Sequence, residues 1–110
     1  MILASTTVLA NESGVTLKLD AEMEDSLLVV APVVTTDHAA TLRYEVTARK
    51  LGSAGVTSTR QAGTVRVAPD HAVSLSTLRL STASGDRYSI TATLYDNGAK
   101  VAEKTLTQVR

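Results

Sequence analysis

Residues 41–50 read Thr-Leu-Arg-Tyr-Glu-Val-Thr-Ala-Arg-Lys, and from Leu42 to Arg49 apolar and polar side chains alternate without a break. Successive side chains of a β-strand point to opposite faces, so this period of two predicts a strand with one buried and one solvated face. The side chains expected to point inward are those of Leu42, Tyr44, Val46 and Ala48. The stretch predicts a sheet that covers a core on one side and meets water on the other.

Several other stretches carry strand signals of different kinds. Residues 15–19 and 88–94 alternate in the same way, and Asn97-Gly98 predicts a tight hairpin turn because both residues accept positive φ angles. Residues 27–34 are almost all apolar, which is typical of a strand covered on both faces or one that crosses between sheets. Pro32 lies inside this run and has no N–H group, so we expect a sheet edge or a bulge there.

Residues 55–63 contain strand-forming side chains but few apolar ones, which favours a position at the edge of a sheet. Apolar character returns at Val65 and Val67, on the same parity as Gln61. The sequence leaves open whether residues 56–67 form one strand or two. Further on, Val73 and Leu75 lie on one parity and Leu78 on the other, so we expect a bulge between them.

The overall composition favours a single all-β domain. A chain of 110 residues supports one hydrophobic core, and its aromatic content of 3% requires that core to be aliphatic. About seven strands joined by short turns predict an immunoglobulin-like antiparallel β-sandwich, in the architectural sense only, because the Cys and Trp of antibody domains are missing. We expect residues 14–108 to form this domain and residues 1–13 to be a flexible tail.

The residue types argue against an enzyme. The absence of Cys excludes disulfides, thiol redox chemistry and cysteine zinc sites. No nucleophile elbow or phosphate-binding glycine loop is present, so we predict no catalytic residue and no cofactor. Three Tyr are too few to form stacking platforms for nucleic acid, and no apolar stretch is long enough to span a membrane.

Two Asp-His pairs have matching surroundings, at Asp37-His38 and Asp70-His71. They could gather around a metal only if residues 56–67 form one strand, which would put both turns at the same end of the sandwich. The simpler interpretation is an Asp in each turn beside an exposed His, and we therefore predict no metal site.

Charge is distributed unevenly, although the formal net charge is zero. Residues 12–37 carry six acidic side chains and one lysine, whereas residues 43–66 carry five basic side chains and one glutamate. The basic stretch is either an ordinary solvated face or a surface that attracts an acidic partner.

Pairing of residues 41–50 with 56–67 as a hairpin would place Arg49 opposite Ser58 and Arg60 opposite Thr47, with Arg43 opposite Thr64. Four arginines would then share one solvent face. We predict a partner-binding site made of Arg43, Arg49, Arg60, Gln61 and Arg66. The alternative is that the arginines only keep an exposed sheet soluble and block edge aggregation.

An ordered set of short motifs carries a family resemblance from about residue 40 to residue 106. The motifs are residues 52–55, Thr59-Arg60-Gln61, residues 64–69, residues 75–81, residues 85–88 and Asp96-Asn97-Gly98. Together they resemble the CsgC/CsgH family of curli chaperones. Some members carry a Cys-x-Cys pair where this chain has Ala40-Thr41-Leu42, so the chain looks closer to the cysteine-free CsgH type.

The resemblance implies a periplasmic, non-enzymatic protein that binds curli subunits and prevents premature amyloid assembly. We expect it to be a monomer. Residues 1–4 lack the basic region of a secretory signal, and the native N-terminus stays open. The rival hypothesis is a structural or adhesive immunoglobulin-like domain of a larger extracytoplasmic protein. The sequence does not decide whether contact is through a sheet edge or a face, or whether the target is a monomer, an oligomer or a fibril end.

Overall fold

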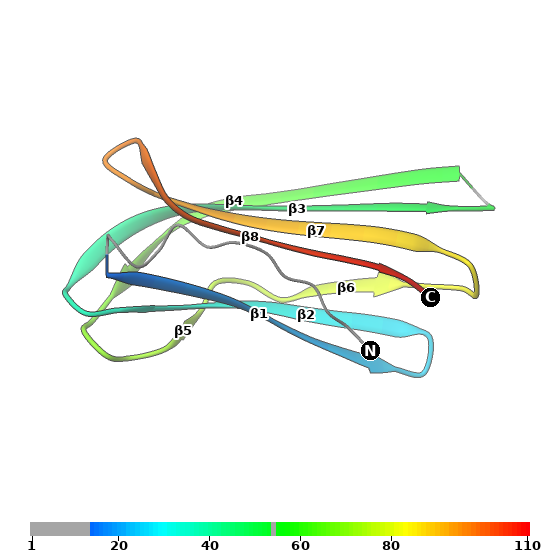
Figure 1. The fold of residues 1–110 in the computed structure, drawn as a ribbon, viewed down its shortest axis with the longest axis horizontal. Coiled ribbons are helices and arrows are strands. Elements are labelled where there is room, and N and C mark those ends of the chain that lie inside the picture. The colour runs from blue at the N-terminus through cyan, green and yellow to red at the C-terminus, as the bar shows by residue number, and fades with distance from the viewer. Residues whose placement is uncertain (1–13, 54) are drawn as a thin grey trace.

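In the part of the chain that the structure describes, eight β-strands form two antiparallel sheets that pack face to face (Figure 1). The computed structural model describes residues 14–53 and 55–110, so the expected tail at residues 1–13 lies outside the described residues. The strands are β1 (Val15–Glu24), β2 (Leu27–Thr36), β3 (Ala40–Gly52), β4 (Gly55–Val67), β5 (Val73–Ser74), β6 (Leu78–Ser81), β7 (Arg87–Asp96) and β8 (Ala99–Val109). The predicted all-β sandwich is confirmed.

One sheet, here called sheet A, has β2 at its centre, with β1 on one side and both β5 and β6 on the other. Sheet B has the order β4-β3-β7-β8. The edge strands β1 and β8 contact each other and close one side of the sandwich. The opposite side is bordered by β4 of sheet B and by the short strands β5 and β6 of sheet A (Figure 1).

Strand β4 is continuous from Gly55 to Val67 and pairs with β3 along its whole length without a register shift. The one-strand alternative is therefore correct, and β4 lies at the edge of sheet B as predicted. Gly63 pairs with Tyr44, and a Cβ atom at Gly63 would lie 2.7 Å from the Tyr44 hydroxyl oxygen. A glycine in this strand leaves room for the ring of its cross-strand neighbour.

The expectation that Pro32 lies at a sheet edge was wrong, whereas the bulge expected between Leu75 and Leu78 is present, because the register with β2 shifts by one residue there. Strand β2 is central, and it pairs with β1 through Pro32 with no bulge. The interruption lies in the strands that pair with the other side of β2. Strand β5 pairs with Val33 and Val34, whereas β6 pairs with residues 27–30. The Pro32 carbonyl accepts from the Leu75 N–H (2.9 Å), so the missing N–H faces the interval where the partner strand changes. This split also explains why the structure has eight strands where the sequence suggested about seven.

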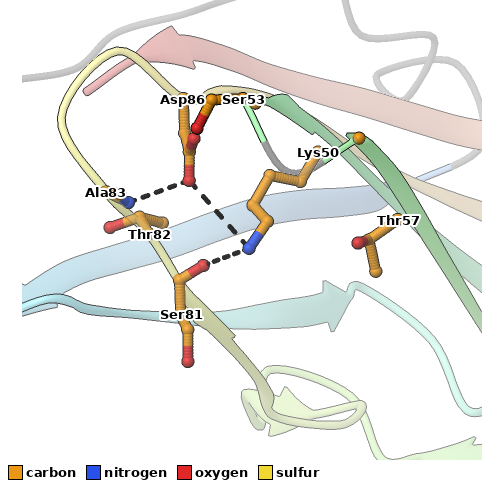
Figure 2. Close-up of a pocket in the computed structure, with 9 residues that line it drawn as sticks. Lys50, Ser53, Thr57, Ser81, Thr82, Ala83 and Asp86 are labelled. Atoms are coloured by element: carbon orange, nitrogen blue, oxygen red, sulfur yellow. Dashed lines mark hydrogen bonds and ion pairs between the residues drawn. The ribbon is translucent and has the colours of Figure 1, made fainter.

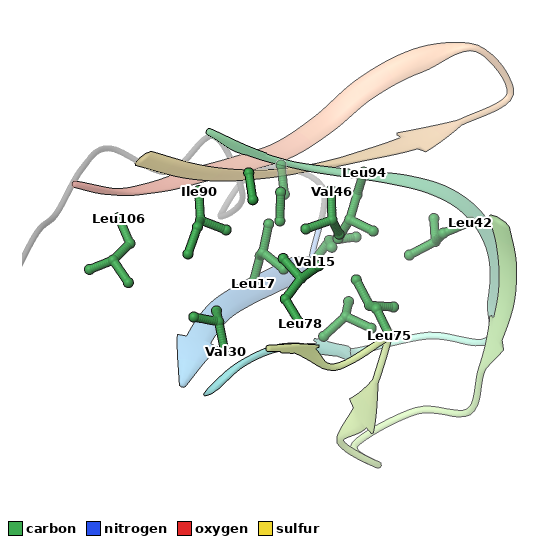
Figure 3. Close-up of a cluster of buried hydrophobic side chains, with 14 of the residues drawn as sticks. Val15, Leu17, Val30, Leu42, Val46, Leu75, Leu78, Ile90, Leu94 and Leu106 are labelled. Carbon is green, nitrogen blue, oxygen red and sulfur yellow. The ribbon is translucent and has the colours of Figure 1, made fainter. Parts of the chain in front are cut away.

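The core is mainly aliphatic, with one buried aromatic ring at Tyr88, and it is supplied by both sheets (Figure 3). Leu42, Val46 and Ala48 are buried as the alternation in β3 predicted, and Tyr44 is half-buried. Strand β7 supplies Tyr88, Ile90, Ala92 and Leu94 from its inward face. Full burial of one Val or Leu side chain stabilises the fold by about 1.5–3 kcal/mol, so this cluster is what holds the two sheets together.

The expected hairpin at Asn97-Gly98 is confirmed. Asn97 has a φ of 53° and Gly98 a φ of 84°, the positive angles that a tight two-residue turn requires. The turn joins β7 to β8, and the register of that pair shifts once, at Leu94 and Tyr95.

We expect Leu42→Ala to lower the free energy of unfolding by about 2–5 kcal/mol, because it removes a fully buried side chain and leaves a cavity between the sheets. The matched control is Thr41→Ala, an exposed neighbour on the same strand, which should change the value by only about 0.5 kcal/mol or less. Urea unfolding followed by circular dichroism measures both. Equal stabilities for the two variants would contradict this account of the core.

Candidate functional site

Four arginines lie together on the outward face of β3 and β4. The predicted register is correct, since Arg49 pairs with Ser58, Thr47 with Arg60 and Arg43 with Thr64. All four arginine side chains are exposed on the face of sheet B that points away from sheet A. We call Arg43, Arg49, Arg60 and Arg66 the arginine surface.

Glu45 is the acidic residue within this surface, and it binds two of the arginines. Its Oε2 atom accepts hydrogen bonds from Arg60 (2.7 Å) and Arg43 (3.3 Å). The hydrogen bond from Arg60 is the main cause that lowers the pKa of Glu45, with the charge of Arg60 and the contacts of Arg43 acting in the same direction. The Arg43 guanidinium also lies 4.7 Å from the centre of the Tyr95 ring, in a cation–π contact.

Arg49 and Arg66 form no ion pair or side-chain hydrogen bond with any residue in the described ranges. The outward positions of β3 and β4 therefore hold four guanidinium groups against one carboxylate, a net charge of +3. The guanidinium groups of Arg49 and Arg66 therefore remain available for a partner.

Uncharged hydroxyl groups border the arginine surface on the same face of sheet B. Thr47 pairs with Thr91, and the Thr91 and Thr105 Oγ1 atoms are 3.0 Å apart. The outward face next to the arginines is therefore polar and can exchange hydrogen bonds with another chain.

Gln61 is not part of the arginine surface. It pairs with Val46, whose side chain is in the core, so Gln61 points to the inner face of β4 and is only half-exposed. Adjacent residues of a strand point to opposite faces, and for this reason Arg60 and Gln61 do not share one face of sheet B.

A cleft of about 240 Å³ lies between the end of hairpin β3–β4 and the loop that joins β6 to β7 (Figure 2). The Lys50 Nζ atom donates to the Ser81 carbonyl (2.6 Å) and lies 4.0 Å from Asp86 Oδ2. Asp86 Oδ2 also accepts from the Ala83 N–H at 2.8 Å. Lys50 thus connects β3 of sheet B to β6 of sheet A, and Asp86 holds the β6–β7 loop against the end of β3.

Sequence reasoning missed this connection, although one signal was present. Lys50 has the same parity as the inward residues of β3, so its charged side chain had to reach across the sandwich. Asp86 gave no such signal, because its partner lies 36 positions away along the chain. Gly52 completes the contact, since a Cβ atom there would clash with the Asp86 carboxylate.

The two Asp-His turns lie at the same end of the sandwich, because the single strand β4 places them there and Thr36 bridges to Pro69. His38 nevertheless contacts its own neighbour Asp37 (2.6 Å), and His71 contacts the Pro69 carbonyl (3.0 Å). Across the described residues, no three His, Cys, Asp or Glu side chains are placed to hold a metal ion. The same part of the chain contains no helix long and apolar enough to span a membrane.

Residues 8–106 match the model of the Tafi-CsgC family, which is described as "Thin aggregative fimbriae synthesis protein". The chain belongs to this family. Its fold is similar to the solution structure of R. palustris CsgH, with a TM-score of 0.68 and 20% identity over 84% of this chain and 90% of that one. It is also similar to the E. coli curli protein CsgC, with a TM-score of 0.72 and 20% identity over 82% and 96% of the two chains. No curated protein sequence matches it.

We predict that Glu45→Gln destabilises the protein at neutral pH and that this difference from the parent shrinks as the pH falls. Glu45 has a lowered pKa in the folded state, so its contribution is complete above the ordinary carboxyl pKa and disappears as the pH drops through the lowered value. Urea unfolding of both proteins at several pH values measures the effect. Glu22→Gln, which removes an exposed carboxylate from sheet A, is the control, and the same pH trend in both variants would contradict the prediction.

Asp86→Ala should lower the free energy of unfolding by about 1–3 kcal/mol, because it removes both the acceptor of the Ala83 N–H and the partner of Lys50. Asp86→Asn keeps an oxygen acceptor and should cost less. Thermal unfolding of the two variants tests this order. An Asp86→Ala protein as stable as the parent would show that the contacts of Asp86 with Ala83 and Lys50 do not stabilise the fold.

Proposed function

We propose that this protein is a periplasmic, chaperone-like inhibitor that binds curli amyloid subunits and delays their assembly. It acts as a monomer, without catalysis or a cofactor. Membership of a family of fimbriae synthesis proteins supports a role connected with these fibres. The observation that carries the proposal is the arginine surface, in which Arg49 and Arg66 have no partner among the described residues.

The curli subunit contacts the outward face of sheet B more than the edge of β4. All four arginines point away from the core of the sandwich, perpendicular to the edge of β4. Such a surface attracts acidic or amide-rich segments from a distance and raises the rate of encounter. Binding that depends on exposed charges is weak and reversible, which suits an inhibitor that must release its partner.

Amyloid fibres grow when strands add to open edges. A subunit held against the outward face of sheet B presents fewer groups to another subunit. The free edge of β4 itself is rich in Thr, Ser and Arg, and charged side chains at an edge discourage further strand addition. The protein can therefore contact an aggregating chain without becoming part of the fibre.

The test is the kinetics of amyloid-dye fluorescence for a purified curli subunit with substoichiometric amounts of this protein. We expect a longer lag time, and a smaller effect as salt is raised beyond about 0.1 M, where screening acts over about 10 Å. An unchanged lag time would contradict the proposal and would favour the structural or adhesive alternative.

Paired charge reversals locate the contact. Arg49→Glu combined with Arg66→Glu should remove most of the inhibition, because these two guanidinium groups have no partner in the described ranges. The matched control is Lys18→Glu combined with Arg79→Glu, which makes the same charge change on exposed positions of sheet A. Equal inhibition by the two variants would overturn the assignment to the arginine surface and leave the inhibitor role standing.

A further inference from the structure

Three aliphatic side chains on the outward face of sheet B are strongly exposed and lie in one row across the strands. Val56 is 58% exposed, Val109 57% and Leu51 41%. The pairs Val56–Leu51, Leu51–Arg87 and Arg87–Val109 connect them directly, so the row crosses all four strands. We call Val56, Leu51 and Val109 the aliphatic row.

Exposed hydrophobic side chains are usually scattered singly over a protein surface, whereas these three are grouped. The described residues contain four exposed large hydrophobic side chains, and the fourth is Met23 on sheet A. Directly opposed side chains in a sheet have Cβ atoms about 4.5–5.5 Å apart, so Val56 and Leu51 form a continuous apolar surface. The aliphatic stem of Arg87 continues it towards Val109. Apolar side chains that gather on a surface mark a contact with another molecule more often than single ones do.

Strands β8 and β3, which carry Val109 and Leu51, are each held in place next to the row. At the end of β8, the Arg110 N–H donates to the Asp86 carbonyl (2.8 Å) and the Arg110 guanidinium donates to the Thr82 carbonyl (2.7 Å). At the end of β3, Lys50 ties the strand to Ser81. Figure 1 shows that hairpin β3–β4 projects beyond β7 and β8 at this end of the sheet. A surface fixed in advance loses less conformational entropy when a partner binds.

We propose that the aliphatic row and Arg49 together bind an extended segment of the partner in which an aliphatic residue and an acidic residue are two positions apart. Arg49 and Leu51 are two positions apart on β3 and point the same way, so an aligned partner strand with this spacing meets both at once. Arg49 and Arg87 form no ion pair with a described residue, and their charge selects a carboxylate next to the aliphatic side chain. This inference rests on the proposed function, because the segment belongs to the amyloid-forming subunit.

The proposal makes the aliphatic contact separable from the charge contact. Screening by salt weakens the attraction of the arginines but does not weaken apolar burial. The parent protein should therefore keep part of its inhibition at about 1 M salt. A variant without the aliphatic row should lose this salt-resistant part.

The experiment measures the lag time of the curli subunit with the parent, with the triple variant Leu51→Thr, Val56→Thr, Val109→Thr, and with Met23→Thr as control. Thr keeps a branched side chain suited to a strand, and all these positions are exposed, so circular dichroism should show an unchanged fold. We expect the triple variant to need on the order of tenfold more protein for the same lag, and Met23→Thr to match the parent. The single variant Val56→Thr should shift in the same direction, which keeps the test valid if the triple variant unfolds.

A triple variant that inhibits as well as the parent at high salt would overturn this inference and leave the proposed function intact. A parent protein that does not lengthen the lag time would contradict both this inference and the proposed function. Sedimentation and vesicle flotation of the protein without the curli subunit test whether a second copy or a lipid surface binds the aliphatic row instead. A parent dimer that the triple variant dissociates, or vesicle binding that the triple variant loses, would assign the row to a second copy or to a lipid surface and overturn the inference.

Discussion

The register between β3 and β4 is the constraint on which the rest of the structure depends. Side chains alternate along both strands, so a slip of one residue would turn Leu42 and Val46 towards water and bring the arginines into the core. Burying an unpaired guanidinium costs far more than any hydrogen bond of the ladder returns. The aliphatic core and the charged outer face are therefore two results of one alignment.

The same alignment separates charge across the sandwich. The outward positions of β3 and β4 carry a net charge of +3, whereas β1 presents Asp20, Glu22 and Glu24 on the outward face of sheet A. The uneven charge along the sequence becomes an uneven charge in space. Lys50 is the exception among the basic residues of its stretch, since it points inward and binds across to sheet A.

The sequence was sufficient to predict the all-β fold and the inward residues of β3, because both follow from the local period of two. It also predicted the cross-strand pairs of Arg43, Arg49 and Arg60, because these follow from the hairpin. It failed where contacts join distant segments. The Lys50–Asp86 pair depends on the pairing of β3 with β7, which brings Asp86 beside the end of β3, and the aliphatic row depends on pairings between four strands. The placement of Gln61 on the arginine surface was wrong for a simpler reason. Gln61 was grouped with Arg60 because the two are adjacent in sequence, although neighbouring residues of a strand point to opposite faces.

The position of Pro32 matters before the chain has folded. Residues 27–34 are the kind of uncharged, β-prone segment that seeds cross-β aggregation when it is exposed, and Pro32 interrupts that segment after its first five residues. In the native sheet the proline removes no ladder bond, since its missing N–H falls between β5 and β6. The proline thus limits cross-β aggregation of this segment while the chain is newly made.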